Sequence, residues 1–145
     1  MTEIAIRKTG CVGHITLTRP KALNALTHDM CLRIFAALTE WQSDDDVAAV
    51  ILDAEGEKAF CAGGDIAELY ETGMRGEFDY GQSFWRDEYR LNALLATYAK
   101  PVVSFMPPAT EGSRAMALGV NTSRPATSTI SVRPNSAAVF SELTM

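Results

Sequence analysis

The chain has 145 residues, of which 47% are hydrophobic and 21% are charged, and this composition is typical of one globular domain. The formal net charge of −5 and the absence of any run of Lys or Arg argue against nucleic acid as a partner. No apolar segment approaches the roughly 20 residues that cross a membrane, and no secretory signal is recognisable, so we expect a cytoplasmic protein without membrane contact.

The N-terminal part of the chain predicts a β-hairpin followed by a helix. Residues 3–8 and 12–18 read as two strands. Residues 19–24 contain a proline that disfavours a continuing strand, which predicts a loop. Thr27 suits the N-cap of a helix that ends near residue 42. Apolar residues recur in this helix at helical spacing, at Met30, Ile34, Leu38 and Trp41.

The next segments alternate strands with helices. Residues 47–52 are almost uninterruptedly apolar, which predicts a strand buried on both faces, as in a parallel sheet. A short helix is expected from Asp65 to about residue 72, followed by a polar loop over 73–81. An amphipathic helix over 84–98 and a buried strand over 101–105 complete the pattern. Helices that alternate with apolar strands indicate an α/β fold.

A double glycine ahead of an aspartate is the most informative motif of the chain. Gly63 and Gly64 permit positive φ and close approach of a ligand to the backbone. Asp65 suits the N-cap of the next helix, with Glu68 placed as in a capping box. Backbone N–H groups at such a turn can hold a phosphate, or an oxygen that gains negative charge. The spacing alone also fits a plain loop before a capped helix, and it matches neither the dinucleotide fingerprint nor the P-loop.

Other reactive or aromatic side chains fit structural roles. Cys61 is predicted to be packed rather than nucleophilic, because no His or Asn partner is placed near it. Asp65 is predicted to be a cap rather than an acid or base, and His28 to be exposed in the first helical turn. A solvated helix face is expected at Asp87, Glu88 and Arg90, and packing roles at Trp41 and Trp85. The cysteines and histidines form no zinc pattern, so no metal is expected.

Residues 3–106 resemble the first part of the enoyl-CoA hydratase/isomerase (crotonase) superfamily. Three segments carry the resemblance in the expected order, at residues 17–26, 58–66 and 100–103. A fourth, over residues 84–92, is similar to the 3-hydroxyisobutyryl-CoA hydrolase branch. The resemblance implies a crotonase-like spiral of ββα repeats, here incomplete, and an acyl-CoA thioester as the ligand.

The resemblance also implies roles for individual residues. Gly64 matches a residue whose backbone N–H helps to hold the thioester oxygen, and this is the one catalytic role carried over. The main chain of Ala62 matches a position near the adenine of CoA. The full set of implied substrate-binding residues is Lys21, Ala22, Leu23, Ala62, Gly63, Gly64 and Asp65. Coenzyme A is part of this substrate, so no separate cofactor is expected.

The resemblance ends at residue 106, so we expect an N-terminal acyl-CoA domain over 1–106 and a non-matching tail over 107–145. Pro, Ser, Thr, Ala and Arg dominate the tail, which is expected to be disordered or frame-shifted and not to complete the domain. Family members carry a second oxyanion donor in a turn after the last strand, where Pro107 and Pro108 have no N–H to donate. No catalytic acid or base is carried over.

Three functions stay open at this point. The first is an acyl-CoA thioester hydrolase, in particular the 3-hydroxyisobutyryl-CoA hydrolase of valine degradation, with this chain truncated and inactive. The second is a non-catalytic fragment that binds acyl-CoA. The third is an enoyl-CoA hydratase or isomerase of another branch, which residues 89–92 disfavour. Full-length family members form oligomers, but the segments through which they assemble are not evident here.

Overall fold

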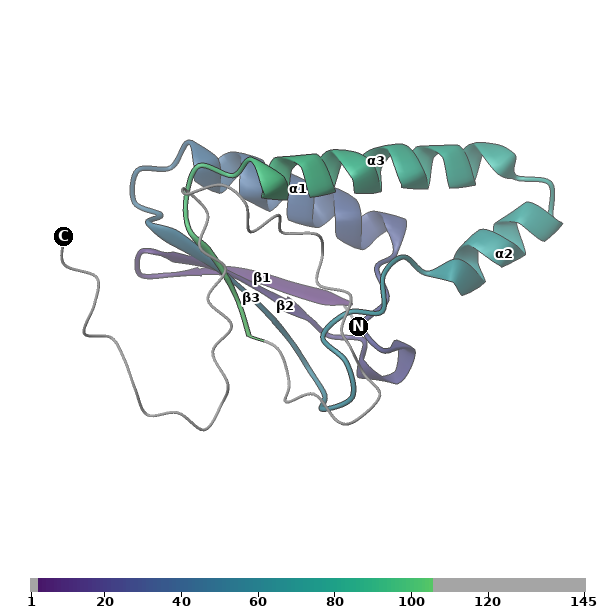
Figure 1. Cartoon of the computed structure of the whole chain (residues 1–145), viewed down its shortest axis with the longest axis horizontal. Helices are drawn as coiled ribbons and strands as arrows, with labels where there is room; N and C mark the ends of the chain where they lie inside the picture. The colour runs from purple at the N-terminus through teal and green to yellow at the C-terminus, as the bar shows by residue number, and fades with distance from the viewer. Residues whose placement is uncertain (1–2, 106–145) are drawn as a thin grey trace.

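The computed structural model describes residues 3–105, which form a four-stranded sheet with helices on one face (Figure 1). The elements are β1 (Ile4–Thr9), β2 (Val12–Leu17), the 3-10 helix η1 (Pro20–Ala22), α1 (His28–Gln42), β3 (Ala49–Ala54), α2 (Ile66–Met74), α3 (Phe78–Ala96) and β4 (Val102–Ser104). The strand order is β1-β2-β3-β4, with β1 antiparallel to β2 and the other pairs parallel. The predicted hairpin and the α/β arrangement are confirmed.

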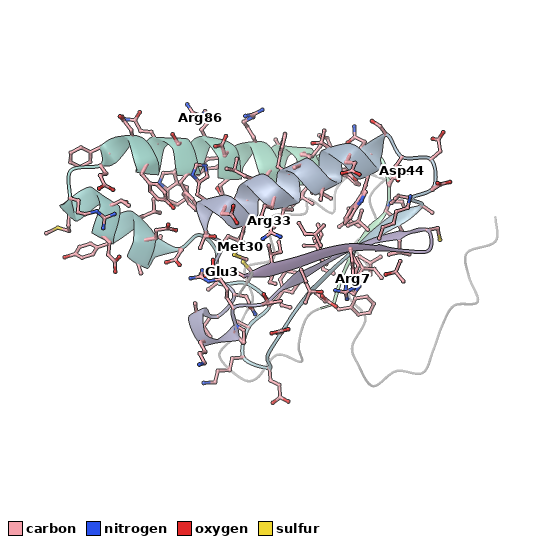
Figure 2. The ribbon with its side chains drawn as sticks, turned by 180° about the vertical axis from the view of Figure 1, so that it is seen from behind. Glu3, Arg7, Met30, Arg33, Asp44 and Arg86 are labelled. Atoms are coloured by element: carbon pink, nitrogen blue, oxygen red, sulfur yellow. The ribbon has the colours of Figure 1, made fainter. Side chains whose placement is uncertain are left out.

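Helix α1 begins and ends as the sequence predicts. The Thr27 side chain accepts a hydrogen bond from the Met30 N–H at 3.3 Å, which satisfies a donor that the first turn leaves free. The predicted apolar face is buried, and Figure 2 shows Met30 between α1 and the sheet. At the other end, the Lys100 ammonium donates to the carbonyls of Trp41 and Asp44, both at 2.6 Å. Lys100 therefore binds the negative end of the helix.

We expect Lys100→Met to lower the free energy of unfolding by about 1–2 kcal/mol, because the variant keeps the aliphatic stem but leaves two helix-end carbonyls without their cation. Thermal unfolding should be compared with Lys58→Met, which removes an exposed ammonium and is expected to change stability by less than about 0.5 kcal/mol. Equal melting temperatures for the two variants would contradict the capping role.

The strand β3 differs from its prediction. It begins at Ala49 rather than at residue 47, and its side chains alternate between the two faces of the sheet. Val50 and Leu52 are buried on the helix side, whereas Ile51 is only half-buried. The prediction of near-complete burial on both faces is wrong because β2 pairs with β3 in a register that surrounds the second face with polar side chains. That face carries Arg7, His14, Thr16 and Asp53 (Figure 2 labels Arg7).

Helix α3 is longer than predicted at its N-terminal end. The glycines in residues 73–81 suggested a loop, but α2 runs through Gly73 and α3 already contains Gly81. Of the three glycines in residues 73–81, only Gly76 has positive φ, at 77°, so the real connection is a short turn around that residue. The two helices fold back on each other, and α3 then lies alongside α1 (Figure 1).

The core lies between the sheet and these helices. Phe84, Leu91 and Leu95 of α3 pack with residues of α1 and the strands. Trp41 is buried, as predicted, against the backbone of Gly13. Trp85 is 41% exposed, and its ring packs edge to face on Phe84 with centroids 5.2 Å apart, so its packing role lies at the edge of the core. No helix within residues 3–105 is long and apolar enough to cross a membrane. The predictions for residues 107–145 lie outside the described residues.

Candidate functional site

The double-glycine turn pairs with the segment that leads into α1. The Leu26 N–H donates to the Gly63 carbonyl at 2.8 Å, and the Asp65 N–H donates to the Leu26 carbonyl at 2.9 Å. Peptide groups alternate in direction along extended backbone, so these two bonds turn the Gly64 N–H away from Leu26. Among residues 3–105 this N–H donates no hydrogen bond. The predicted donor therefore lies at an unpaired edge of the turn.

The two glycines are needed for different reasons. Gly63 has φ 96°, in the region that only glycine enters without strain. Gly64 is not in that region, but a Cβ there would lie 2.7 Å from Cζ of Phe84. The sequence attributed both glycines to positive φ and to close approach of a ligand, and the positive φ is confirmed for Gly63 but wrong for Gly64. Phe84 fills the space that a side chain would need.

Asp65 caps α2 as predicted. Its Oδ1 accepts hydrogen bonds from the N–H groups of Ala67 at 3.1 Å and Glu68 at 3.2 Å. The capping box is absent, because the Asp65 N–H already donates to Leu26 and leaves nothing for the Glu68 carboxylate to bind. Glu68 instead lies beside Tyr80, where burial and this neighbouring carboxylate both raise the pKa of the phenol.

Arg19 connects the loop before α1 to the cap of α2. Its guanidinium donates to Asp65 Oδ2 at 2.9 Å and to the Ala25 carbonyl at 2.6 Å, and it also pairs with Glu3 at 2.9 Å. Burial opposes ionisation of Asp65, but the Arg19 hydrogen bond and the two backbone donors outweigh it and hold the pKa of Asp65 below its usual range. Sequence reasoning assigned no role to Arg19.

The lowered pKa of Asp65 predicts a loss of stability in acid. The ionised carboxylate stabilises the fold above its unfolded pKa of about 3.9, and this contribution disappears as the pH falls through the lower folded pKa. Asp65→Asn should therefore be less stable than the parent at pH 7, and its stability should fall less steeply between about pH 5 and pH 2. Denaturant unfolding at several pH values measures this, with the exposed Asp29→Asn as control. Parallel pH profiles for parent and Asp65→Asn would contradict it.

The residues expected along CoA lie together beside the turn. Leu23 accepts a hydrogen bond from the Ala62 N–H at 3.0 Å, which joins the two predicted CoA segments. Lys21 and Leu23 line a cleft of about 400 Å³, and Ala22 lies between them at the end of η1. The other residues that line this cleft are Pro20, Glu55, Gly56, Glu57, Lys58 and Ala59. Lys21 and Lys58 bring positive charge to the cleft, and Glu55 and Glu57 bring an equal negative charge.

Asn24 is a site residue that sequence reasoning missed. It is fully buried, and its Nδ2 donates to the carbonyls of Glu55 at 2.9 Å and Ala59 at 3.0 Å. Its Oδ1 accepts from the Arg19 N–H at 2.9 Å. The backbone φ of 55° is one that asparagine tolerates better than most residues. Asn24 therefore ties the loop of residues 19–24 to the far wall of the cleft, and an asparagine inside an apolar motif was the available signal.

Two further predictions have opposite outcomes. Cys61 is buried and accepts a hydrogen bond from the Gly63 N–H at 3.4 Å, and burial raises the pKa of its thiol. A packed thiol is what the sequence predicted. His28, predicted to be exposed, is instead half-buried and lies 2.8 Å from Asp87 Oδ2 through Nε2. The prediction of a solvated helix face is therefore wrong for Asp87 and for the half-buried Glu88, whereas Arg90 is exposed as predicted. No cluster of His, Cys, Asp or Glu within residues 3–105 could hold a metal ion.

Comparison with known sequences shows which proteins this chain is similar to. Residues 12–122 match the sequence model of the family described as enoyl-CoA hydratase/isomerase. This match extends beyond residue 106, into residues that the structure does not describe. The chain is 47% identical over 105 residues to the mitochondrial 3-hydroxyisobutyryl-CoA hydrolase of Danio rerio. The aligned part is 72% of this chain and 27% of that protein, so the chain spans about a quarter of the length of this curated relative.

Solved structures share the fold of the described residues. An enoyl-CoA hydratase from Rhodobacter sphaeroides 2.4.1 superposes with a TM-score of 0.70 at 53% identity, over 73% of this chain and 32% of that one. A carnitinyl-CoA dehydratase from Mycobacterium thermoresistibile superposes with a TM-score of 0.68 at 43% identity, over 72% of this chain and 30% of that one. The similarity therefore covers most of this chain and about a third of each neighbour.

Proposed function

Because the chain belongs to the enoyl-CoA hydratase/isomerase family, we propose that it binds an acyl-CoA thioester and directs the Gly64 N–H at the thioester oxygen. The family and the incomplete crotonase-like fold expected from the sequence are both confirmed. For the whole protein we propose hydrolysis of 3-hydroxyisobutyryl-CoA, which is the activity in the name of the Danio rerio relative.

The observation that carries this proposal is the hydrogen bond between Ala62 and Leu23. It joins the loop that lines the cleft to the turn that holds Gly64, within two residues of the unpaired donor. A ligand whose polar end occupies the cleft can therefore extend a carbonyl group along the turn. Because the Gly64 N–H donates no hydrogen bond within residues 3–105, such a carbonyl can accept a hydrogen bond from it.

The chemistry of thioester cleavage fits this arrangement. Attack of water on the thioester carbonyl places negative charge on oxygen, and a fixed backbone donor stabilises that charge without having to reorient. Removing one such donor typically lowers kcat by about 10²–10³-fold. Asp65 is not suited to donate a proton, since its lowered pKa and its bonds to Arg19 keep it ionised.

Hydration of an enoyl-CoA is the second candidate. It is favoured by the name of the Rhodobacter sphaeroides neighbour, which is 53% identical over the aligned part. The same N–H donor would then stabilise the charge on an enolate oxygen rather than on a tetrahedral intermediate. The segment of residues 89–92 favours the hydrolase. A cytoplasmic location and a role in valine degradation stay predictions, and the Danio rerio relative is named as mitochondrial.

Binding of CoA to the purified chain tests the proposal, with Leu23→Asp as the variant. Leu23 lines the cleft, is 43% exposed and has φ 52°, a conformation that Asp tolerates well. The new carboxylate should repel the CoA phosphates and weaken binding about tenfold or more, measured by isothermal titration calorimetry. Leu32→Asp is the matched control, since Leu32 is 46% exposed on α1. Absence of saturable CoA binding, or equal weakening by both variants, would contradict the proposal.

A further inference from the structure

The ring of Phe84 lies directly against Gly64. An ideal Cβ on Gly64 would be 2.7 Å from Cζ and 2.9 Å from Cε1 of this ring, and Phe84 is only 1% exposed. The hydrogen bonds to Leu26 hold one edge of the turn, and Phe84 supports it from the direction of the missing side chain. The donor peptide thus has two separate supports.

Phe84 is in turn held by a polar contact between α1 and α3. Its ring meets the His28 ring edge to face, with centroids 6.1 Å apart and an interplanar angle of 76°. The other side of His28 meets Tyr80 at 5.7 Å, and His28 Nε2 lies 2.8 Å from Asp87 Oδ2. Tyr80, Phe84 and Asp87 are spaced so that they share one face of α3, and together they surround His28 of α1.

We propose that Phe84 is a positioning residue for the Gly64 N–H, and that the His28–Asp87 hydrogen bond keeps Phe84 in place. A backbone donor contributes to catalysis only while its direction is fixed, so a ring that prevents the turn from shifting acts on the reaction without touching the ligand. The role of the donor rests on the proposed function, whereas the support of the turn by Phe84 does not.

The first test uses the unliganded chain. The ¹⁵N order parameter of Gly64 should be near 0.85 in the parent and fall below about 0.6 in Phe84→Leu, because the turn loses its support. Leu91→Ala is the control, since Leu91 is also 1% exposed on α3 and its truncation costs core packing away from the turn. A fall at Gly64 of the same size in both variants, or in neither, would overturn the inference.

The second test isolates the hydrogen bond to the ligand. Acetyl-CoA has a thioester carbonyl, whereas S-ethyl-CoA has the same size without that oxygen, so their affinity ratio reports the Gly64 donor. The parent should prefer acetyl-CoA by about three- to tenfold, the range that one hydrogen bond gives. Phe84→Leu should remove most of this preference while its affinity for S-ethyl-CoA stays unchanged, and Leu91→Ala should keep the preference. A preference retained in Phe84→Leu would overturn the inference.

Two substitutions at Asp87 test the outer part of the support. Asp87→Asn keeps an oxygen that can accept from His28 and should retain the thioester preference, whereas Asp87→Leu should lose it. Equal behaviour of these two variants would overturn the role of the His28–Asp87 bond. If the parent binds both ligands equally, the proposed function is contradicted, and the order parameters alone then decide the role of Phe84.

Discussion

The 145-residue chain alone is expected to bind 3-hydroxyisobutyryl-CoA without useful hydrolysis. In the proposed function Gly64 supplies one oxyanion donor, and the resemblance places the second where Pro107 and Pro108 have no N–H. No acid or base within residues 3–105 is assigned to the reaction. One missing donor and one missing acid or base each typically lower the rate by about a hundredfold or more, so turnover should be at least about 10⁴-fold below that of an ordinary enzyme.

The measurement is the release of free CoA thiol from 3-hydroxyisobutyryl-CoA by purified chain. Turnover near the 1–10³ s⁻¹ that is typical of enzymes would contradict the prediction and would mean that residues after 106 supply the missing groups. Gly64→Pro is the control for contaminating thioesterases, because it deletes the donor N–H. Activity that Gly64→Pro abolishes belongs to this chain, and activity that survives the substitution does not.

The parts of the fold that depend on local chemistry could be predicted from the sequence. Thr27 satisfies a free donor at the start of α1, and Asp65 does the same for α2, so both helix starts follow from residue type and spacing. The hairpin likewise follows from strand patterns separated by a glycine turn. The start of α3 could not be predicted, because Gly73 and Gly81 resemble turn residues until tertiary packing places them in helices.

The parts of the site that depend on distant contacts were missed. Phe84 reaches Gly64 from another element, so nothing near Gly64 in the sequence shows why that position lacks a side chain. Asp87 meets His28 across 59 positions of sequence, which turns a predicted solvated face into a half-buried contact. The resemblance assigned Lys21, Leu23 and Ala62 to the ligand, and in the structure Lys21 and Leu23 line one cleft while the Ala62 N–H donates to the Leu23 carbonyl. Their contact with a ligand stays a prediction.

Asn24→Ala is expected to damage both the fold and the cleft. It removes three hydrogen bonds from a fully buried position and leaves the carbonyls of Glu55 and Ala59 unpaired. It also puts alanine at φ 55°, where most side chains are strained. Together these effects should lower the free energy of unfolding by about 3–5 kcal/mol, measured by urea unfolding, which is a large part of the stability of a domain of this size.

Two companion variants separate the causes of this loss. Asn24→Gly tolerates the positive φ but still loses the hydrogen bonds, so it should be more stable than Asn24→Ala by about 1 kcal/mol. Asn92→Ala removes a half-buried amide whose one side-chain partner within residues 3–105 is the Glu88 carboxylate, and it should cost less than about 1 kcal/mol. Because Leu23 and Lys21 line the cleft next to Asn24, Asn24→Gly should also bind CoA more weakly than Asn92→Ala. If Asn24→Gly and Asn92→Ala have the same stability and the same CoA affinity, Asn24 does not hold the loop of residues 19–24 in place.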